Sequence, residues 1–186
     1  MIEDIINERN STVCFTGHRN LPKGDELKRL IAATDAMIAA AYSHGYRVFV
    51  AGGAVGFDTL AACRVIVIKK RLPDVKLRLV LPCRNQTEKW TKTEDIALYK
   101  HIMGCAETVE YITDFYNDKC MLERNRAMVD RSALCIAYCT KAKGGSAYTV
   151  NYAKKEGLGV INIGENSYSA SEFDRFAVFG GVGKDT

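Results

Sequence analysis

The sequence predicts an α/β fold in which helices cover both faces of a doubly wound, mostly parallel sheet. Short apolar runs alternate with helical patterns about six times, and several runs are continuous, as in strands buried on both faces. A length of 186 residues and a hydrophobic fraction of 47% fit one buried core. We therefore expect a single domain over 1–186, with its core at about 12–164 and a C-terminal extension at 165–186.

The strands are expected at six apolar runs that are bounded by Gly, Pro or polar residues. These runs are TVCFT at 12–16, RVFVA at 47–51, LRLVLP at 77–82, TVEYI at 108–112, LCIAY at 134–138 and GVINI at 159–163.

Helices are expected between these runs. Apolar residues from Leu27 to Ala41 follow helical spacing. Thr93 is predicted to cap a helix that runs towards Met103, and Ser146 a helix that stops at Gly157. The Arg-rich stretch 122–133 has the spacing of a helix before the fifth strand. Near the end of the chain, SASEFDRFA reads as a short helix and GGVGKDT as a frayed terminus.

Charge and cysteine content limit the function classes. The chain has 26 Lys and Arg residues and 22 Asp and Glu residues, so its net charge is 26 − 22 = +4. The charges are scattered along the chain, which permits a phosphate-bearing ligand without demanding nucleic acid. The seven cysteines are odd in number and form no C-x-x-C pair, so we expect reduced thiols and no metal site. No run reaches membrane-spanning length, and acids stand where a signal peptide carries bases. We expect a cytoplasmic protein without membrane contact.

Ligands of open parallel sheets bind beyond the carboxyl ends of the strands, so the loops there are the candidates. TGHRN at 16–20 follows the first strand. Gly17 allows a sharp turn, Arg19 offers donors for a phosphate or carboxylate, and His18 can donate or accept. For His18 a ligand contact and a solvated side chain remain equally open.

The second loop, AGGAVGFD at 51–58, follows the second strand. Gly52 and Gly53 permit close approach of a ligand to the backbone, and Gly56 lies where helix amides can bind an anion. Asp58 has two open interpretations: it accepts hydrogen bonds from a sugar hydroxyl, or it caps a helix that begins at Thr59.

Two further segments carry candidate residues. In LERNRAMVDRSA at 122–133, the trio Arg124, Asn125 and Arg126 suggests a binding role, although Arg126 has the spacing to pair with Asp130 in solvent. Arg131 is expected on the hydrated surface. In the second segment, KGGSAYTVNYA at 143–153, Gly144 and Gly145 open a turn before a helix that begins at Ser146, whose free amides could hold a phosphate.

A single tryptophan follows the third strand. Trp90 stands in NQTEKW with Glu88 and Lys89. Its ring either stacks on a base or packs within the protein, and packing is the commoner role of a lone tryptophan in a loop.

At these segments the sequence resembles the SLOG superfamily, whose Rossmann-like domains include the YpsA-like proteins, the DNA-processing protein DprA and the LOG phosphoribohydrolases. TGHR at 16–19 is most similar to the YpsA-like group. AGGAVGFDTLAA at 51–62 is similar to the SGxAxGxDxxAH loop of DprA, with Ala51 in place of the Ser and Ala62 in place of the His. The RNR of 124–126 and GGSAYTVNYA resemble later DprA motifs.

The resemblance implies a bacterial or phage protein with a pocket for a nucleotide-like ligand. It places in that pocket Gly17, His18, Arg19, Gly52, Gly53, Gly56, Asp58, Arg124, Asn125, Gly144, Gly145 and Ser146. The arginines would neutralise phosphate and Asp58 would hold a ribose hydroxyl. No cofactor beyond such a ligand is implied.

One departure separates the chain from the LOG enzymes. Their P-G-G-x-G-T-x-x-E signature ends in a catalytic Glu, and Asn151 occupies that position here. An amide cannot serve as a general acid or base, so the LOG activity is not carried over.

Three functions therefore remain as hypotheses. The favoured one is a sensing or regulatory protein that binds a nucleotide-derived small molecule without turnover. The second is a hydrolase of an N-glycosidic or phosphate bond that uses His18, Asp58 or Glu88. The third is DprA-like binding of single-stranded nucleic acid, which the absence of a concentrated basic groove disfavours without excluding it. Self-association into a homo-oligomer stays open.

Overall fold

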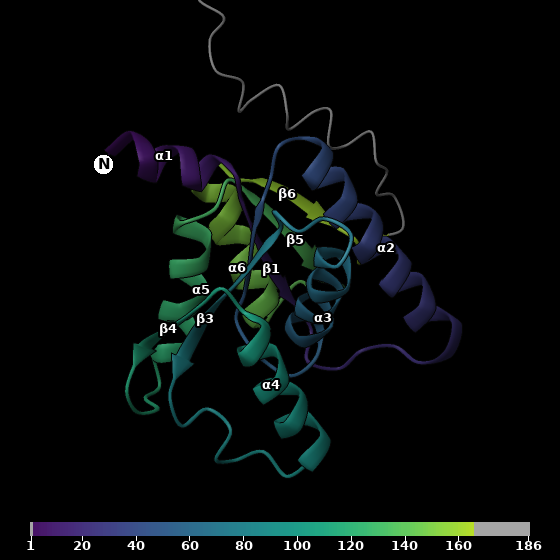
Figure 1. Ribbon diagram of the computed structural model, residues 1–186. Helices are drawn as coiled ribbons and strands as arrows, with labels where there is room; N and C mark the ends of the chain where they lie inside the picture. Colours follow the sequence, from purple (N-terminus) through teal and green to yellow (C-terminus); the bar gives the residue numbers. More distant parts are fainter. Residues whose placement is uncertain (1, 166–186) are drawn as a thin grey trace, which may run out of the picture.

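A computed structural model, which describes residues 2–165, shows one six-stranded sheet in the order β4-β3-β2-β1-β5-β6 (Figure 1). Every neighbouring pair is parallel, which confirms the predicted α/β class. The strands are β1 Thr12–Gly17, β2 Val48–Ala51, β3 Lys76–Cys83, β4 Thr108–Thr113, β5 Leu134–Tyr138 and β6 Gly159–Asn162. Each matches one of the six apolar runs. The short helix and frayed end expected beyond residue 165 lie outside the described residues.

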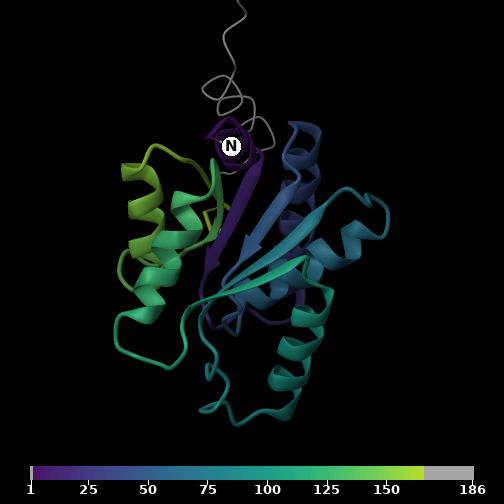
Figure 2. The same ribbon diagram turned by 60° about the vertical axis from the view of Figure 1, so that its left-hand side comes forward.

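Helices cover both faces of the sheet (Figure 2). On one face lie α2 Gly24–Ser43, α3 Phe57–Lys69 and α4 Thr93–Cys105. On the other lie α5 Cys120–Asp130 and α6 Gly145–Lys155. No helix among residues 2–165 is long and apolar enough to cross a bilayer.

An additional helix, α1 Ile2–Asn10, precedes β1 and was not expected from the sequence. Polar contacts join its C-terminal half to distant segments: Arg78 of β3 pairs with Glu8, and Arg9 donates to the Asp130 carbonyl. Ile2, Ile5 and Ile6 have helical spacing, but this apolar pattern is too short to have indicated the helix.

Two apolar clusters, one on each face, hold the layers together. Successive residues of β1 point to opposite faces, so Phe15 joins the cluster under α2 and α3 whereas Cys14 joins the cluster under α5 and α6. Phe15 stacks on Phe49 and meets Phe57 edge to face, with ring centroids 6.1 and 6.3 Å apart. This burial on both sides explains why the strand sequences are continuously apolar. All seven cysteines are free thiols.

The helix starts differ from the expected caps. Thr93 and Ser146 are not caps: α4 begins at Thr93 after Lys92, and α6 begins at Gly145 after Gly144, with no side-chain cap at either start. The predicted end of α6 holds, because Gly157 has a φ of +78° just past the helix.

The strand order reverses between β1 and β5, which lie side by side at the centre of the sheet. The chain leaves β1 towards α2 on one face and leaves β5 towards α6 on the other. This switch point is where open α/β sheets form a ligand crevice.

Candidate functional site

Hydrogen bonds join the loops at the carboxyl edge of the sheet, as the position of the motifs predicted. The His18 carbonyl accepts from the Phe57 amide at 3.0 Å, which ties the loop after β1 to the start of α3. The Gln86 side chain donates to the Gly53 carbonyl at 2.9 Å, which ties the loop after β3 to the loop after β2. The Thr140 amide donates to Nε2 of His18 at 2.7 Å, which adds the loop after β5.

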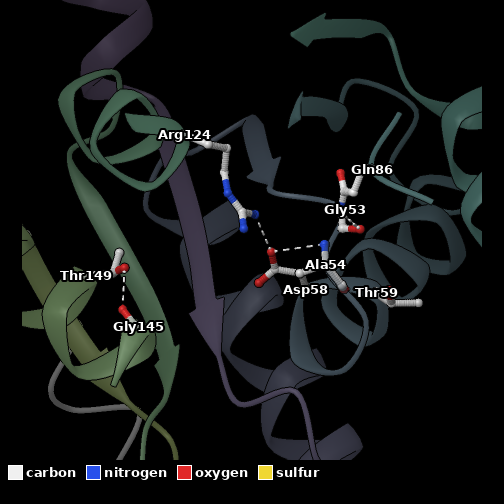
Figure 3. A network of polar contacts seen from close by, with 8 residues as sticks. All are labelled: Gly53, Ala54, Asp58, Thr59, Gln86, Arg124, Gly145 and Thr149. Atoms are coloured by element: carbon white, nitrogen blue, oxygen red, sulfur yellow. Dashed lines mark hydrogen bonds and ion pairs between the residues drawn. The ribbon is translucent and has the colours of Figure 1, made fainter. Parts of the chain in front are cut away.

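A buried ion pair crosses this edge from one helix layer to the other (Figure 3). Nη1 of Arg124, on α5, donates to Oδ2 of Asp58, on α3, at 2.9 Å. The two side chains are only 6% and 8% exposed. Burial raises the pKa of the Asp58 carboxyl above its ordinary value, and the Arg124 guanidinium opposes that rise. Nε of Arg124 is buried without a partner among the described residues, so the guanidinium retains donor capacity.

Asp58 is therefore neither the predicted helix cap nor an open carboxylate. The helix begins at Phe57, two residues before the expected Thr59, so Asp58 lies inside the helix and the cap position is Gly56, which has no side chain. The Asp58 carboxylate instead faces Arg124, with a long contact of 3.5 Å from the Ala54 amide.

Protein atoms occupy the space beside four of the predicted glycines. A Cβ on Gly52 would lie 1.4 Å from Nη1 of Arg124, so only glycine lets that side chain reach Asp58. Gly56 has a φ of +102°, and a Cβ there would lie 2.3 Å from the Arg19 carbonyl oxygen. Gly17 and Gly53 similarly abut Phe57 and Leu81. These glycines make room for the protein's own packing.

Gly144 and Gly145 differ from those four. A Cβ on either would meet nothing within 4 Å, and both residues are exposed before the uncapped start of α6. The predicted approach of an anion to backbone amides is therefore sterically open there. Ser146, in the first turn of α6, and Asn125, beside Arg124 on α5, make no side-chain hydrogen bond within residues 2–165.

His18 and Arg19 diverge although they are neighbours. Burial, and next the positive charge of Lys141, lower the pKa of His18 below its ordinary value of 6.5. Because Nε2 accepts from the Thr140 amide, the neutral ring carries its proton on Nδ1. Arg19 is exposed and has no ion-pair partner in the described chain.

Arg19 lines an open cavity of about 760 Å³, here called the Arg19 cavity, between α2, α3, α4 and the segment that joins β3 to α4. Four apolar side chains, Leu27, Ile31, Leu60 and Leu98, form what is called its floor here, and Trp90 also lines it. Its charged lining is Arg19, Lys23, Lys89, Lys92 and Asp95. Its volume lies in the range of small-molecule sites. Of the predicted residues, only Arg19 and Gly56 line it. For the remaining lining, the available sequence signal was Trp90 with Lys89 and Lys92 close to it, in the loop after a buried strand.

Other charged residues of the motifs are already engaged. Arg126 and Asp130 do not pair as predicted: Nε of Arg126 donates to the Tyr148 hydroxyl at 2.7 Å, and Asp130 accepts from the Tyr152 hydroxyl at 2.8 Å. Arg131 pairs with Glu110 of β4.

The glycine positions generate a paired prediction. Gly52→Ala is expected to destabilise the protein by at least about 2 kcal/mol, because the added Cβ displaces Arg124 from a buried pair. Gly145→Ala, whose Cβ meets open space, is expected to be neutral or to stabilise by up to about 1 kcal/mol. Urea unfolding measures both. Equal free energies of unfolding for the two variants would contradict the packing role of Gly52.

A second prediction concerns pH. The folded protein binds a proton at His18 less readily than the unfolded chain, because the pKa of His18 is lowered on folding. The stability from this residue is therefore complete above pH 6.5 and is lost as the pH falls towards the folded pKa. Thermal unfolding at pH 7.5 and about pH 5.5 should show a smaller pH-dependent loss in His18→Gln than in the unaltered protein. Equal losses in the two proteins would contradict a lowered pKa of His18 in the folded state.

Known proteins resemble this chain in sequence and in fold. The chain is 27% identical over 143 residues to the uncharacterized SPbeta prophage-derived protein YoqJ of Bacillus subtilis strain 168, covering 70% of this chain and 81% of that protein. It is 31% identical over 108 residues to a UPF0398 protein of Bacillus cereus strain G9842, covering 56% of this chain and 58% of that protein.

Two solved structures share the fold. DNA processing protein A of Streptococcus pneumoniae superposes with a TM-score of 0.59 at 18% identity, covering 96% of this chain and 58% of that chain. DNA processing protein A of Helicobacter pylori, described for its unique single-stranded DNA binding mode, superposes with a TM-score of 0.57 at 19% identity. This match covers 95% of this chain and 82% of that chain. Residues 13–159 match the YspA SLOG family, and the chain belongs to that family, which confirms the resemblance that its motifs carried.

Proposed function

We propose that the chain binds a nucleotide or nucleotide-derived ligand in the Arg19 cavity and acts as a sensing or regulatory protein without turnover. One observation carries the proposal: the cavity combines an apolar floor with four cations that have no ion-pair partner within residues 2–165. A phosphate neutralises such cations, and a base or sugar covers the apolar floor. A purely apolar ligand would leave the cations unused.

The other predicted residues take supporting roles in this proposal. Asp58 and Arg124 hold α3 and α5 in place from beneath the edge, since each is buried against the other. The open start of α6 at Gly144 and Gly145 offers a separate anion contact on the opposite side of the β1 loop.

Absence of turnover is supported by the state of the candidate acids and bases. Asp58 is engaged by Arg124, and Nε2 of His18 is engaged by Thr140. Glu88 accepts from the Asn85 side chain at 3.0 Å. Asn151 is an exposed amide on α6. A hydrolase would need Asp58, His18 or Glu88 to leave its present partner and contact the substrate, because the amide of Asn151 cannot transfer a proton.

The first test of this function is a thermal-shift titration with mononucleotides, dinucleotide cofactors and ADP-ribose, followed by mass spectrometry of the mixtures. A nucleotide is expected to raise the melting temperature and to be recovered intact. Arg19→Ala is expected to weaken binding about tenfold or more, because a charge-assisted contact is lost.

The matched control is Arg71→Ala, which removes an exposed cation beyond the end of α3, outside the residues that line the cavity. Its affinity should equal that of the unaltered protein. Equal weakening by both substitutions would mean that net charge, and not the Arg19 cavity, determines binding. A cleaved nucleotide would replace this proposal with the hydrolase.

A second candidate function, single-stranded DNA binding, is favoured by exposed aromatic residues at the same edge. Phe115 and Tyr116, between β4 and α5, are 76% and 51% exposed. Nζ of Lys89 lies 5.1 Å from the centroid of the Tyr116 ring. Aromatic rings beside cations are the elements on which single-stranded bases stack.

This candidate predicts that oligothymidylate binds at low salt and that affinity falls steeply as salt rises. Phe115→Ala should weaken binding about fivefold or more, because a stacked base is worth about 1–3 kcal/mol. Val67→Ala, at an exposed apolar position of α3, is the control. Fluorescence anisotropy measures oligothymidylate binding by the unaltered protein and by the two variants. Absence of binding at low salt would rule out this candidate function.

A further inference from the structure

Trp90 has a defined place on the wall of the Arg19 cavity. It follows β3, its amide donates to the Thr87 carbonyl at 3.0 Å, and its ring is partly buried. The ring meets Tyr99 of α4 with centroids 5.3 Å apart and planes at 74°. Because Tyr99 is only 7% exposed and belongs to the core, it fixes the indole position while Trp90 still lines the cavity.

The floor of the cavity is unusually apolar for a surface exposed to solvent. Leu27 and Ile31 reach it from α2, Leu60 from α3 and Leu98 from α4. Leu98 is 37% exposed. Three helices therefore contribute apolar side chains to a lining that also contains an aromatic ring, which suits a flat, weakly polar group.

Cations from two segments of the chain also line the cavity. Lys89 and Lys92 flank Trp90, while Arg19 and Lys23 come from the segment between β1 and α2. Asp95 is the single carboxylate in the lining, so the cavity carries an excess of positive charge. The ligand that fits both features has an aromatic ring and more than one negative charge.

Resting on the proposed function, we propose that Trp90 binds the base of the ligand, so that the Arg19 cavity selects nucleotides over sugar phosphates. The base stacks against the indole and covers the leucine floor, and the phosphate lies between the cations of the two segments. The competing role for Trp90 is packing alone, in which case the identity of the ligand's base would not affect affinity.

The sole tryptophan of the chain makes this inference directly measurable. The unaltered protein is titrated with AMP, GMP, CMP and UMP, with ribose 5-phosphate and with inorganic phosphate, and both Trp90 fluorescence and melting temperature are followed. At least one mononucleotide is expected to change the fluorescence saturably, at the concentration that raises the melting temperature. Ribose 5-phosphate is expected to bind at least about fivefold more weakly, since it lacks the stacking group.

Two variants separate stacking from packing. Trp90→Phe retains a ring, and Trp90→Leu retains only apolar volume. The ratio of mononucleotide affinity to ribose 5-phosphate affinity, from calorimetry, should be largely kept by the first variant and should fall about fivefold or more in the second. A packing role would lower both affinities together and leave the ratio unchanged. The fluorescence titration needs no variant, so it decides the matter even if Trp90→Leu fails to fold.

The outcomes distinguish this inference from the proposed function. If mononucleotides and ribose 5-phosphate bind equally and the fluorescence does not change, the base does not contact Trp90, while binding of an anionic ligand stands. If neither compound class raises the melting temperature at millimolar concentration, the proposed function fails, and this inference fails with it.

Discussion

The carboxyl edge of the sheet depends on the buried pair of Arg124 and Asp58, which connects the helix layers of opposite faces across the end of β2. Removing one partner of such a pair leaves an uncompensated buried charge, a cost of about 3–5 kcal/mol. The pair can form only because Gly52 has no side chain. The apolar clusters place α3 and α5 against the sheet, and this one contact between residues 66 positions apart ties the two helices to each other.

Much of the fold was predictable because a parallel sheet buried on both faces produces continuous apolar runs, and all six runs became strands. What failed was local detail. Thr93 and Ser146 have the side chains of helix caps, yet the helices start without a side-chain cap. The helix α1 escaped prediction because its apolar pattern is short, and the contact of its Glu8 with Arg78 joins residues 70 positions apart.

For the candidate site, the sequence again predicted the location but not the detailed contacts. Sequence motifs identified the right edge, because loops after parallel strands meet there. They did not reveal which atoms fill the space beside each glycine: Phe57, Arg124 and Leu81 do so for three of them. Asp58 was ambiguous in the sequence because its partner belongs to a distant helix. The cations and apolar floor of the Arg19 cavity come from three separate segments, so no single motif contains them.

The backbone of the loop after β1 is anchored at this edge, which bears on how the proposed ligand would be held. Carbonyl oxygens of His18 and Arg19 abut Gly56, and the His18 carbonyl also accepts from Phe57, so the loop that carries Arg19 is anchored to the start of α3. If the proposed ligand binds here, this backbone is already in place, and the entropic cost of binding falls mainly on exposed side chains such as Lys23 and Lys92. The proposed anion site would therefore be preorganised, because α3 holds the backbone that carries Arg19 before any ligand arrives.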